Sequence, residues 1–281
     1  MQFDINIIEI ELSSLCNAKC SGCMRTILDN QGKYYHKGNL LLDDIIDWFE
    51  PLDISNTKIK MCGVLGDPMI NPELYEIIFY FLYEKNVRDL EMSTNGGTRT
   101  AQFWKDLGML SKQSDKRFYI HWAIDGVTKN DYRENVVLDR VWDNVHAYHS
   151  TGGHSIWQYI IFDYNEDEVE MARQKAKENG MKFATRVSWR NTSEKSKVTS
   201  KAANKIDSDS YEVVEKRART KQYEDAKIMC RHKIKGELYI GANKRLWPCC
   251  HLYDESVTHK NNDIDHLYEN IGHDFNDLTK R

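Results

Sequence analysis

Three cysteines lie close together near the start of this 281-residue chain: Cys16, Cys20 and Cys23, with the spacing C-x3-C-x2-C. Thiolates on one short loop can ligate three irons of a cubane cluster, which leaves the fourth iron without a protein ligand. An iron with an open position can bind and activate a small molecule, whereas a structural metal site is closed by side chains. The spacing therefore predicts a reactive [4Fe-4S] cluster.

A zinc knuckle is the main alternative for these thiols, and three unrelated cysteines are another. Structural zinc prefers four ligands, commonly from paired C-x2-C units, and the nearest histidine, His36, stands alone in the sequence. The triplet also follows the alternating apolar run from Ile5 to Leu12, which is typical of a strand. The spacing and the placement together favour the iron–sulfur interpretation.

The elements that must position this loop alternate through the first two-thirds of the chain. Strands are predicted at 3–12, 58–62, 88–93, 117–124, 155–162 and 182–187. Helices are predicted at 40–49, 72–85, 101–110, 138–149 and 166–179. Such β/α repeats imply a parallel sheet with right-handed crossovers. Because six units are too few for a closed eight-fold barrel, we expect an α/β fold, an open, partial (β/α)6 TIM-like barrel, with its site at the carboxyl ends of the strands.

The rest of the chain departs from this pattern. The polar stretch 191–209 predicts a linker or loop, and 211–227 predicts a helix. Alternation from Gly236 to Trp247 predicts a β-hairpin, bracketed by Cys230 before it and Cys249-Cys250 after it. We therefore expect a partial barrel over 1–190, a linker and helix over 191–229, and a small auxiliary β-hairpin/helix domain over 230–281.

Composition limits the class of protein. Hydrophobic residues make up 41% of the chain, charged residues 29%, and the net charge is −4, so no overall positive field favours nucleic acid. No apolar stretch approaches the roughly 20 residues that span a bilayer, and the first residues lack signal-peptide features. We expect a cytoplasmic protein that binds neither nucleic acid nor a membrane. In that reducing compartment, cysteines bind metals more often than they form disulfides.

Polar motifs recur where the predicted strands end. Gly66-Asp67-Pro68 follows the second strand, Ser93-Thr94-Asn95 the third, and Asp125 the fourth, with Arg133 shortly after it. The carboxylate of Asp67 could bind an ammonium group, and the short polar side chains could bind a carboxylate or a ribose. Each motif alone is also compatible with an ordinary turn, a helix cap or a surface charge. Their value lies in their occurrence at consecutive strand ends, which converge on one mouth.

With these motifs in order, the chain resembles the radical S-adenosylmethionine (SAM) enzymes, specifically those with a SPASM or shorter twitch auxiliary-cluster domain. Cys16, Cys20 and Cys23 match the CxxxCxxC motif of that family, and Gly66-Asp67-Pro68 resembles its GEP element with Asp in place of Glu. Further similar segments are Ile124-Asp125-Gly126 through Tyr132-Arg133, Ile156 to Phe162 followed by Asn165-Glu166 and Glu168, and Trp247-Pro248-Cys249-Cys250. Gly22 departs from the pattern, since that position is often aromatic.

The resemblance implies a reaction and a set of roles. SAM would chelate the open iron, and its reductive cleavage would give a 5′-deoxyadenosyl radical that abstracts hydrogen from the substrate. The residues that would contact SAM are Gly66, Asp67 (at its ammonium group), Pro68, Ser93, Thr94 and Asn95 (near its carboxylate or ribose). The candidate catalytic residues, which would face substrate, are Asp125 and Arg133; Gln158, a candidate for cofactor binding, could be placed similarly. A reductant such as flavodoxin or ferredoxin would supply the electron.

The resemblance leaves the auxiliary site and the substrate open. Cys230, Cys249 and Cys250 would hold a second, auxiliary iron–sulfur cluster, with His232, His251, Asp254 or substrate as a fourth ligand; a degenerate domain without a cluster is the alternative. The expected substrate is a peptide or a small polar molecule, and peptide or protein modification is the favoured function. The alternatives are a twitch-type dehydrogenase or other enzyme acting on a carbohydrate or alcohol, and a non-catalytic metal-binding scaffold.

Overall fold

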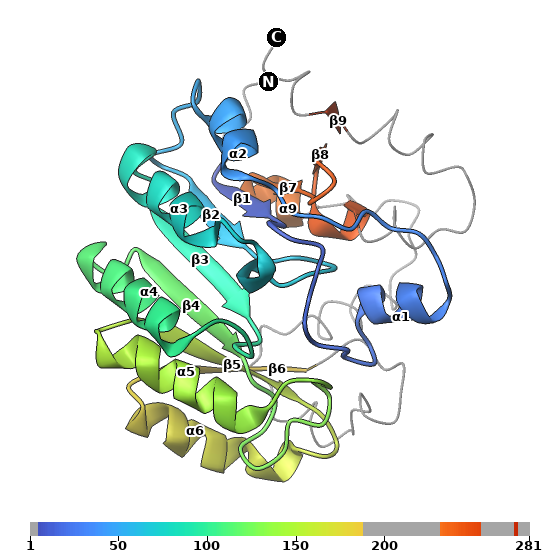
Figure 1. Cartoon of the computed structure of the whole chain (residues 1–281), viewed down its shortest axis with the longest axis vertical. Coiled ribbons are helices and arrows are strands. Elements are labelled where there is room, and N and C mark those ends of the chain that lie inside the picture. The colour runs from blue at the N-terminus through green and yellow to red at the C-terminus, as the bar shows by residue number, and fades with distance from the viewer. Residues whose placement is uncertain (1–4, 188–230, 254–272, 275–281) are drawn as a thin grey trace, which may run out of the picture.

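A single nine-stranded sheet organises the molecule (Figure 1). The computed structural model describes residues 5–187, 231–253 and 273–274. The strand order is β6-β5-β4-β3-β2-β1-β7-β8-β9. The parallel strands of the first two-thirds are β1 (Ile7–Ile10), β2 (Lys58–Met61), β3 (Asp89–Thr94), β4 (Phe118–Ala123), β5 (Ser155–Ile161) and β6 (Lys182–Val187). Each falls within or next to a predicted strand, so the prediction of an open, partial barrel is confirmed.

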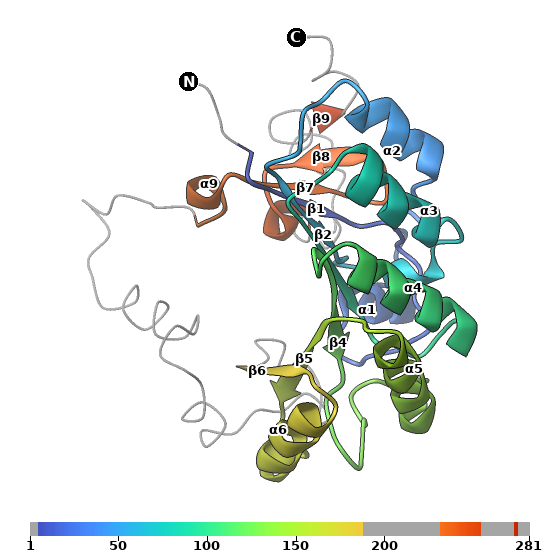
Figure 2. The ribbon, with the colours of Figure 1, turned by 90° about the vertical axis from the view of Figure 1, so that its left-hand side faces the viewer.

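The crossover helices lie on one side of this sheet. They are α2 (Leu42–Phe49), α3 (Leu74–Phe79), α4 (Ala101–Gln113), α5 (Leu138–Ser150) and α6 (Val169–Glu178). Figure 2 shows α2 to α5 standing along one face, with α9 (Arg231–Lys235) on the other side. Apolar residues of the strands, such as Ile8, Ile59 and Trp122, are buried in one continuous hydrophobic core. Burying this face against the helices is the main stabilising term.

The helices differ from expectation in two places. The segment predicted as one helix over 72–85 contains α3 followed by a π-helical turn, Tyr80–Glu84, and apolar spacing alone does not separate these two hydrogen-bonding patterns. A short helix, α1 (Met24–Asn30), follows the third cysteine and was not predicted. Two 3-10 turns are also present: Pro68–Ile70 precedes α3, and Glu166–Glu168 precedes α6.

The predicted C-terminal hairpin is confirmed, and it continues the sheet of the barrel. Strand β7 (Glu237–Ile240) pairs in parallel with β1, and β8 (Arg245–Trp247) pairs with β7 in antiparallel fashion. A two-residue strand, β9 (His273–Asp274), pairs with β8. The predicted linker, the helix at 211–227 and Cys230 lie outside the described residues, so the three-part division stays a prediction. Within the described residues, no helix is both long and apolar enough to cross a membrane.

Candidate iron–sulfur and SAM site

The cysteine triplet occupies the loop between β1 and α1, at the carboxyl end of β1. Cys20 is buried, while Cys16 and Cys23 are half-buried. Cys23 immediately precedes α1, and its amide donates to the carbonyl of Cys20 at 3.0 Å. Burial, reinforced by the carboxylate of Asp67, raises the pKa of Cys16 to about 12. The loop therefore brings three soft donors into a poorly hydrated site.

Gly66 allows the next strand end to pack directly on this loop. A Cβ atom at Gly66 would lie 2.0 Å from the carbonyl oxygen of Ser13, which no real structure tolerates. The adjacent amide of Asp67 donates to the carbonyl of Leu15 at 2.9 Å. Gly66 thus allows the two backbones to pack in direct contact, because glycine has no side chain to keep them apart. Pro68 is buried at the start of the following 3-10 turn.

Asp67 lies at the centre of a buried hydrogen-bond network. Its carboxylate accepts hydrogen bonds from the Thr94 hydroxyl at 2.9 Å, from the backbone amide of Asn95 at 2.9 Å and from the backbone amide of Met69 at 3.0 Å. The side chain is only 5% exposed, and burial raises the pKa of Asp67 against the opposing effect of these bonds. The expected contact with the SAM ammonium group stays a prediction. The visible role of Asp67 is to fix the end of β3.

Asn95 connects that network to the cysteines. Its side-chain amide donates to Asp67 at 2.7 Å and to the Asn17 side chain at 2.9 Å, and it lies 3.6 Å from the Cys16 sulfur. One side chain therefore links the ends of three elements: β3, the turn after β2, and the cysteine loop. Thr94 and Asn95 are both nearly fully buried.

Asp125 and Arg133 form a buried ion pair beside Cys20. The Arg133 Nε atom lies 2.8 Å from Asp125 Oδ2, and Asp125 Oδ1 accepts from the Ile160 amide at 3.0 Å. Burial raises the pKa of the Cys20 thiol, and the nearby Arg133 guanidinium opposes that rise. Because Asp125 has no exposed surface, its visible role is to hold Arg133 near the sulfur. A direct contact of either residue with substrate stays a prediction.

Arg25 is a second cation at the cysteines, and it was not among the predicted site residues. Its guanidinium donates to the carbonyl of Ala18 inside the cysteine loop and pairs with Asp29 at 3.4 Å. Burial would lower the pKa of Arg25, but Cys16 and Cys23 outweigh that effect and raise it. The only signal in the sequence is its position two residues after the third cysteine.

Ser93 and Gln158 lie apart from this buried group. They project from the sheet face opposite the helices, where Ser93 pairs in register with His121 and the Gln158 side chain lies 3.4 Å from the His121 ring. The predicted site residues therefore divide into two sets: one at the buried strand ends around the cysteines, and one on the open side of the sheet.

That open side carries charged or polar side chains on five strands, and we call Glu9, Lys60, Glu91, His121 and Gln158 the polar sheet face. Lys60 pairs with Glu9 at 3.1 Å, and Glu91 pairs with Lys58 at 2.6 Å. Burial would raise the pKa of Glu91, but His121 and Lys58 outweigh it and hold that pKa below its usual value. Apart from Gln158, these residues were not among the predicted site residues, although the alternation of strands such as Ile7-Ile8-Glu9-Ile10 and Lys58-Ile59-Lys60-Met61 indicates a polar face.

The adjacent residues Cys249 and Cys250 have different surroundings. Cys249 is buried, whereas the half-buried Cys250 lies with His232 and His251. Within the described ranges, this is the one trio of metal-ligating side chains whose donor atoms all lie within 4.8 Å of one another. Cys16, Cys20 and Cys23 do not form such a trio, and thiolates that each ligate a separate iron of a cluster need not converge on one point.

The three thiols and their surroundings fit a cubane cluster. Sulfur donors are the ligands that iron–sulfur clusters require, and the thiolates and cluster add negative charge that Arg25 and Arg133 are placed to balance. The Asn95 amide adds a hydrogen-bond donor near one sulfur, and such bonds tune a cluster. These features define the class: an α/β partial barrel whose carboxyl end carries three cysteines suited to an iron–sulfur cluster.

Comparison with known proteins places the chain within that class. Residues 10–176 match the model of the radical SAM superfamily, and the chain belongs to this family. A GTP 3′,8-cyclase from Alkaliphilus oremlandii is 26% identical over 174 residues, which cover 59% of this chain and 51% of that protein. The chain thus spans about half the length of the curated relative it matches.

Solved structures share the fold at low sequence identity. Streptococcus suis SuiB bound to S-adenosylmethionine aligns with a TM-score of 0.63 and 13% identity, covering 94% of this chain and 64% of SuiB. The anSMEcpe structure with bound AdoMet aligns with a TM-score of 0.60 and 12% identity, covering 94% of this chain and 80% of that one. These likenesses show that the described part of the chain shares the fold of these two structures.

Proposed function

We propose that this chain is a radical SAM enzyme that reductively cleaves SAM and uses the resulting radical to abstract hydrogen from its substrate. The observation that carries the proposal is the loop of Cys16, Cys20 and Cys23, flanked by two guanidinium groups. When bound, the [4Fe-4S] cluster and SAM supply the one-electron chemistry.

The chain's own residues have supporting tasks in this proposal. Arg25 and Arg133 stabilise the ionised thiolates, and Asp125 holds Arg133 in place. Asp67 and Asn95 keep the end of β3 fixed against the cysteine loop, so that polar groups at this strand end are preorganised for SAM. Gly66 keeps the loops packed together, which limits the entry of water.

A peptide is the favoured substrate. SuiB has been solved with its precursor peptide SuiA, and anSMEcpe with the Kp18Cys peptide; both structures have TM-scores above 0.5 against this chain. The polar sheet face provides charged and hydrogen-bonding groups on the side of the sheet that the crossover helices leave uncovered. These groups suit the amides and polar side chains of a peptide. A flavodoxin or ferredoxin would be the reductant.

A small polar molecule is the alternative substrate. The similarity to a protein named GTP 3′,8-cyclase favours it, and the polar sheet face could equally bind the hydroxyl groups of a carbohydrate or an alcohol. In that case an auxiliary cluster near Cys249 and Cys250 would accept an electron from the substrate radical, as in a twitch-type dehydrogenase.

SAM cleavage tests the enzyme class directly. The chain is reconstituted anaerobically with iron and sulfide, reduced with dithionite and given SAM, and 5′-deoxyadenosine is measured. We expect product from the unmodified chain and none above background from Cys16→Ala. If both give only background, the chain is a non-catalytic metal-binding scaffold.

Deuterium transfer distinguishes the substrate classes. Mixtures of short peptides made from deuterated amino acids are compared with mixtures of deuterated sugars and alcohols in the same assay. We expect deuterium in 5′-deoxyadenosine from the peptides. Transfer from the sugars or alcohols alone would replace the peptide proposal with the small-molecule alternative.

A further inference from the structure

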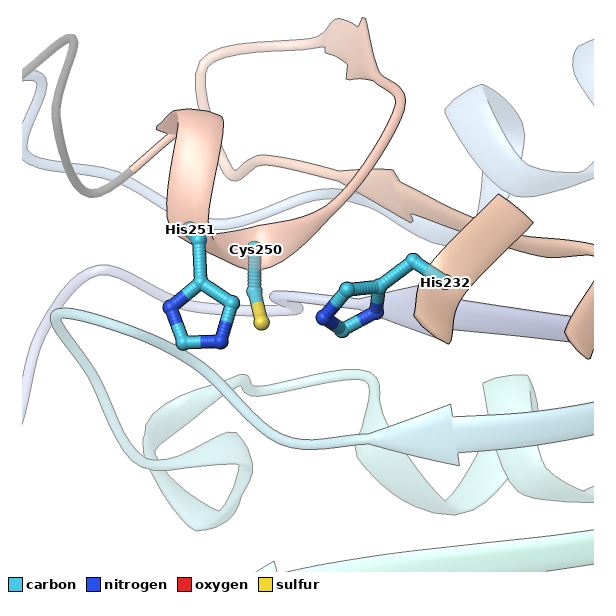
Figure 3. Close-up of side chains that lie close together, drawn as sticks. All are labelled: His232, Cys250 and His251. Atoms are coloured by element: carbon cyan, nitrogen blue, oxygen red, sulfur yellow. The ribbon is translucent and has the colours of Figure 1, made fainter. Parts of the chain in front are cut away.

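The trio of His232, Cys250 and His251 brings together metal-donor atoms from two elements. These elements flank the β7–β8 hairpin in the sequence. His232 lies on α9, just before β7, while Cys250 and His251 lie on the helical turn 250–253, just after β8. Figure 3 shows the two rings on either side of the Cys250 sulfur, with one ring nitrogen of His232 turned toward it. The two rings also contact each other in a T-shaped arrangement, with centroids 5.3 Å apart.

The spacing of the donors suits a single ion. Zinc binds sulfur at about 2.3 Å and histidine nitrogen at about 2.0–2.1 Å, so the tetrahedral ligand atoms of one zinc lie roughly 3.3–3.6 Å from each other. The donor atoms of the trio all lie within 4.8 Å of one another. Binding of zinc would draw these atoms closer together, and because His251 is exposed its side chain can rotate toward the other two.

A carboxylate already orients one of these ligands. His232 Nδ1 lies 2.8 Å from Glu237 Oε2, which leaves Nε2 as the ring nitrogen available to a metal. Metal-bound histidines almost always donate their other ring N–H to a carboxylate, a carbonyl or a water, and this partner fixes the ring and its tautomer. The His232–Glu237 pair has this arrangement, and it is independent of the spacing of the trio.

The local charge also favours a cation. Glu237 and Glu9 both contact Lys60, at 3.4 Å and 3.1 Å, so two carboxylates share one ammonium group next to the trio. Nitrogen and thiolate donors of this kind suit a borderline divalent ion such as zinc better than Mg²⁺ or Ca²⁺, which prefer oxygen.

We propose that His232, Cys250 and His251 bind one zinc ion, with Glu237 orienting His232 and a fourth position open to water or another ligand. The ion would join α9 to the turn 250–253 and so close the β7–β8 hairpin at its two ends. The proposal separates Cys250 from Cys249 and so replaces an auxiliary iron–sulfur cluster on Cys250; it does not depend on the radical reaction proposed above.

Cobalt(II), a spectroscopic substitute for zinc, tests the site in the full-length chain. To exclude the N-terminal thiols, the background carries Cys16→Ser, Cys20→Ser and Cys23→Ser together. We expect this chain to bind one cobalt ion with a thiolate-to-cobalt charge-transfer band. Adding Cys250→Ser should abolish the band, whereas adding Cys249→Ser, the adjacent matched control, should leave it intact.

Two milder variants keep the test valid if Cys250→Ser does not fold. His251→Gln changes an exposed side chain and should weaken cobalt binding more than 10-fold; Glu237→Gln should weaken it roughly 10–100-fold, the usual effect of losing such a partner. The proposal is overturned if the background chain binds no cobalt, if the band survives Cys250→Ser, or if Cys249→Ser removes it equally. SAM cleavage, measured separately in the chain with its N-terminal cysteines intact, reports on the proposed function alone.

Discussion

At the scale of single residues, two cysteines at neighbouring strand ends have different surroundings. Cys20 lies in the loop after β1, close to Arg133. Cys62 follows β2, and its thiol donates to the Glu9 carboxylate at 3.0 Å. Burial and the Glu9 charge raise the pKa of Cys62 well above its usual value. Cys62 is therefore a neutral hydrogen-bond donor on the open side of the sheet, whereas Cys20 is the proposed iron ligand.

This contrast predicts different results for the same substitution. Cys20→Ala removes one of three iron ligands, so we expect loss of cluster iron and of 5′-deoxyadenosine formation. Cys62→Ala removes a hydrogen bond away from the loop, so we expect SAM cleavage within about two-fold of the unmodified chain. Iron content and product are measured in parallel. Loss of iron from Cys62→Ala would show that the ligands are assigned wrongly.

At the scale of elements, the structure depends on a direct contact between the cysteine loop and the turn after β2. Gly66 has no side chain at the point where these two backbones meet. Strand and helix periodicity predicted the elements on either side, because those patterns are local. The contact itself was not predictable. The residues around Gly66 indicate a turn, but they do not show which distant part of the backbone lies against it.

We expect Gly66→Ala to destabilise the protein by about 1–3 kcal/mol, as overpacking does, and to abolish SAM cleavage by separating the loops. Gly180→Asn is the matched control: it lies in a turn with a positive φ of 67°, nothing within 4 Å would meet its Cβ, and asparagine tolerates this conformation. Urea unfolding and 5′-deoxyadenosine formation are measured for both. Equal behaviour of the two variants would contradict the close-packing role of Gly66.

A second element-scale prediction concerns the contact between α5 and β5. Burial lowers the pKa of His149 to about 4, and its Nε2 atom lies 2.8 Å from the Ser155 hydroxyl. As pH falls below about 6.5 the unfolded chain takes up a proton that the folded chain excludes, so His149 contributes a loss of stability between pH 6.5 and 4.

His149→Gln should remove this contribution while keeping a hydrogen-bonding group near Ser155. The free energy of unfolding is measured by urea at several pH values, and the difference between variant and unmodified chain should shift in favour of the variant as pH falls from 6.5 to 4. A difference that is independent of pH would show that His149 is not held neutral by the fold.

At the scale of the whole molecule, the late hairpin is attached to the first strand of the barrel. Strand β7 pairs with β1, and Lys60 on β2 contacts carboxylates from both strands. The sequence predicted the six-repeat barrel and the hairpin separately, each from its own periodicity. The sequence could not show that the hairpin pairs with the barrel, because a parallel pairing between strands more than 200 residues apart leaves no local pattern.

Lys60→Met tests whether that three-strand contact stabilises the fold. Removing the ammonium group leaves Glu9 and Glu237 close together without their shared cation, and we expect a loss of about 1–3 kcal/mol in the free energy of unfolding. The control is Lys244→Met: Lys244 pairs with Asp44 at 2.6 Å but is 54% exposed, so its loss should cost below about 1 kcal/mol. Similar costs for both would show that the charged contact is no stronger than a surface pair.

The central claim is that one iron of the cluster has no ligand from the protein, so that SAM can bind it. The most direct measurement is the electron paramagnetic resonance spectrum of the reduced, reconstituted chain with and without SAM. We predict that SAM changes the g values of the cluster signal, and that Cys16→Ala has no such signal to change. A cluster signal that SAM leaves unaltered would mean that the polypeptide closes the fourth position, and would contradict this account.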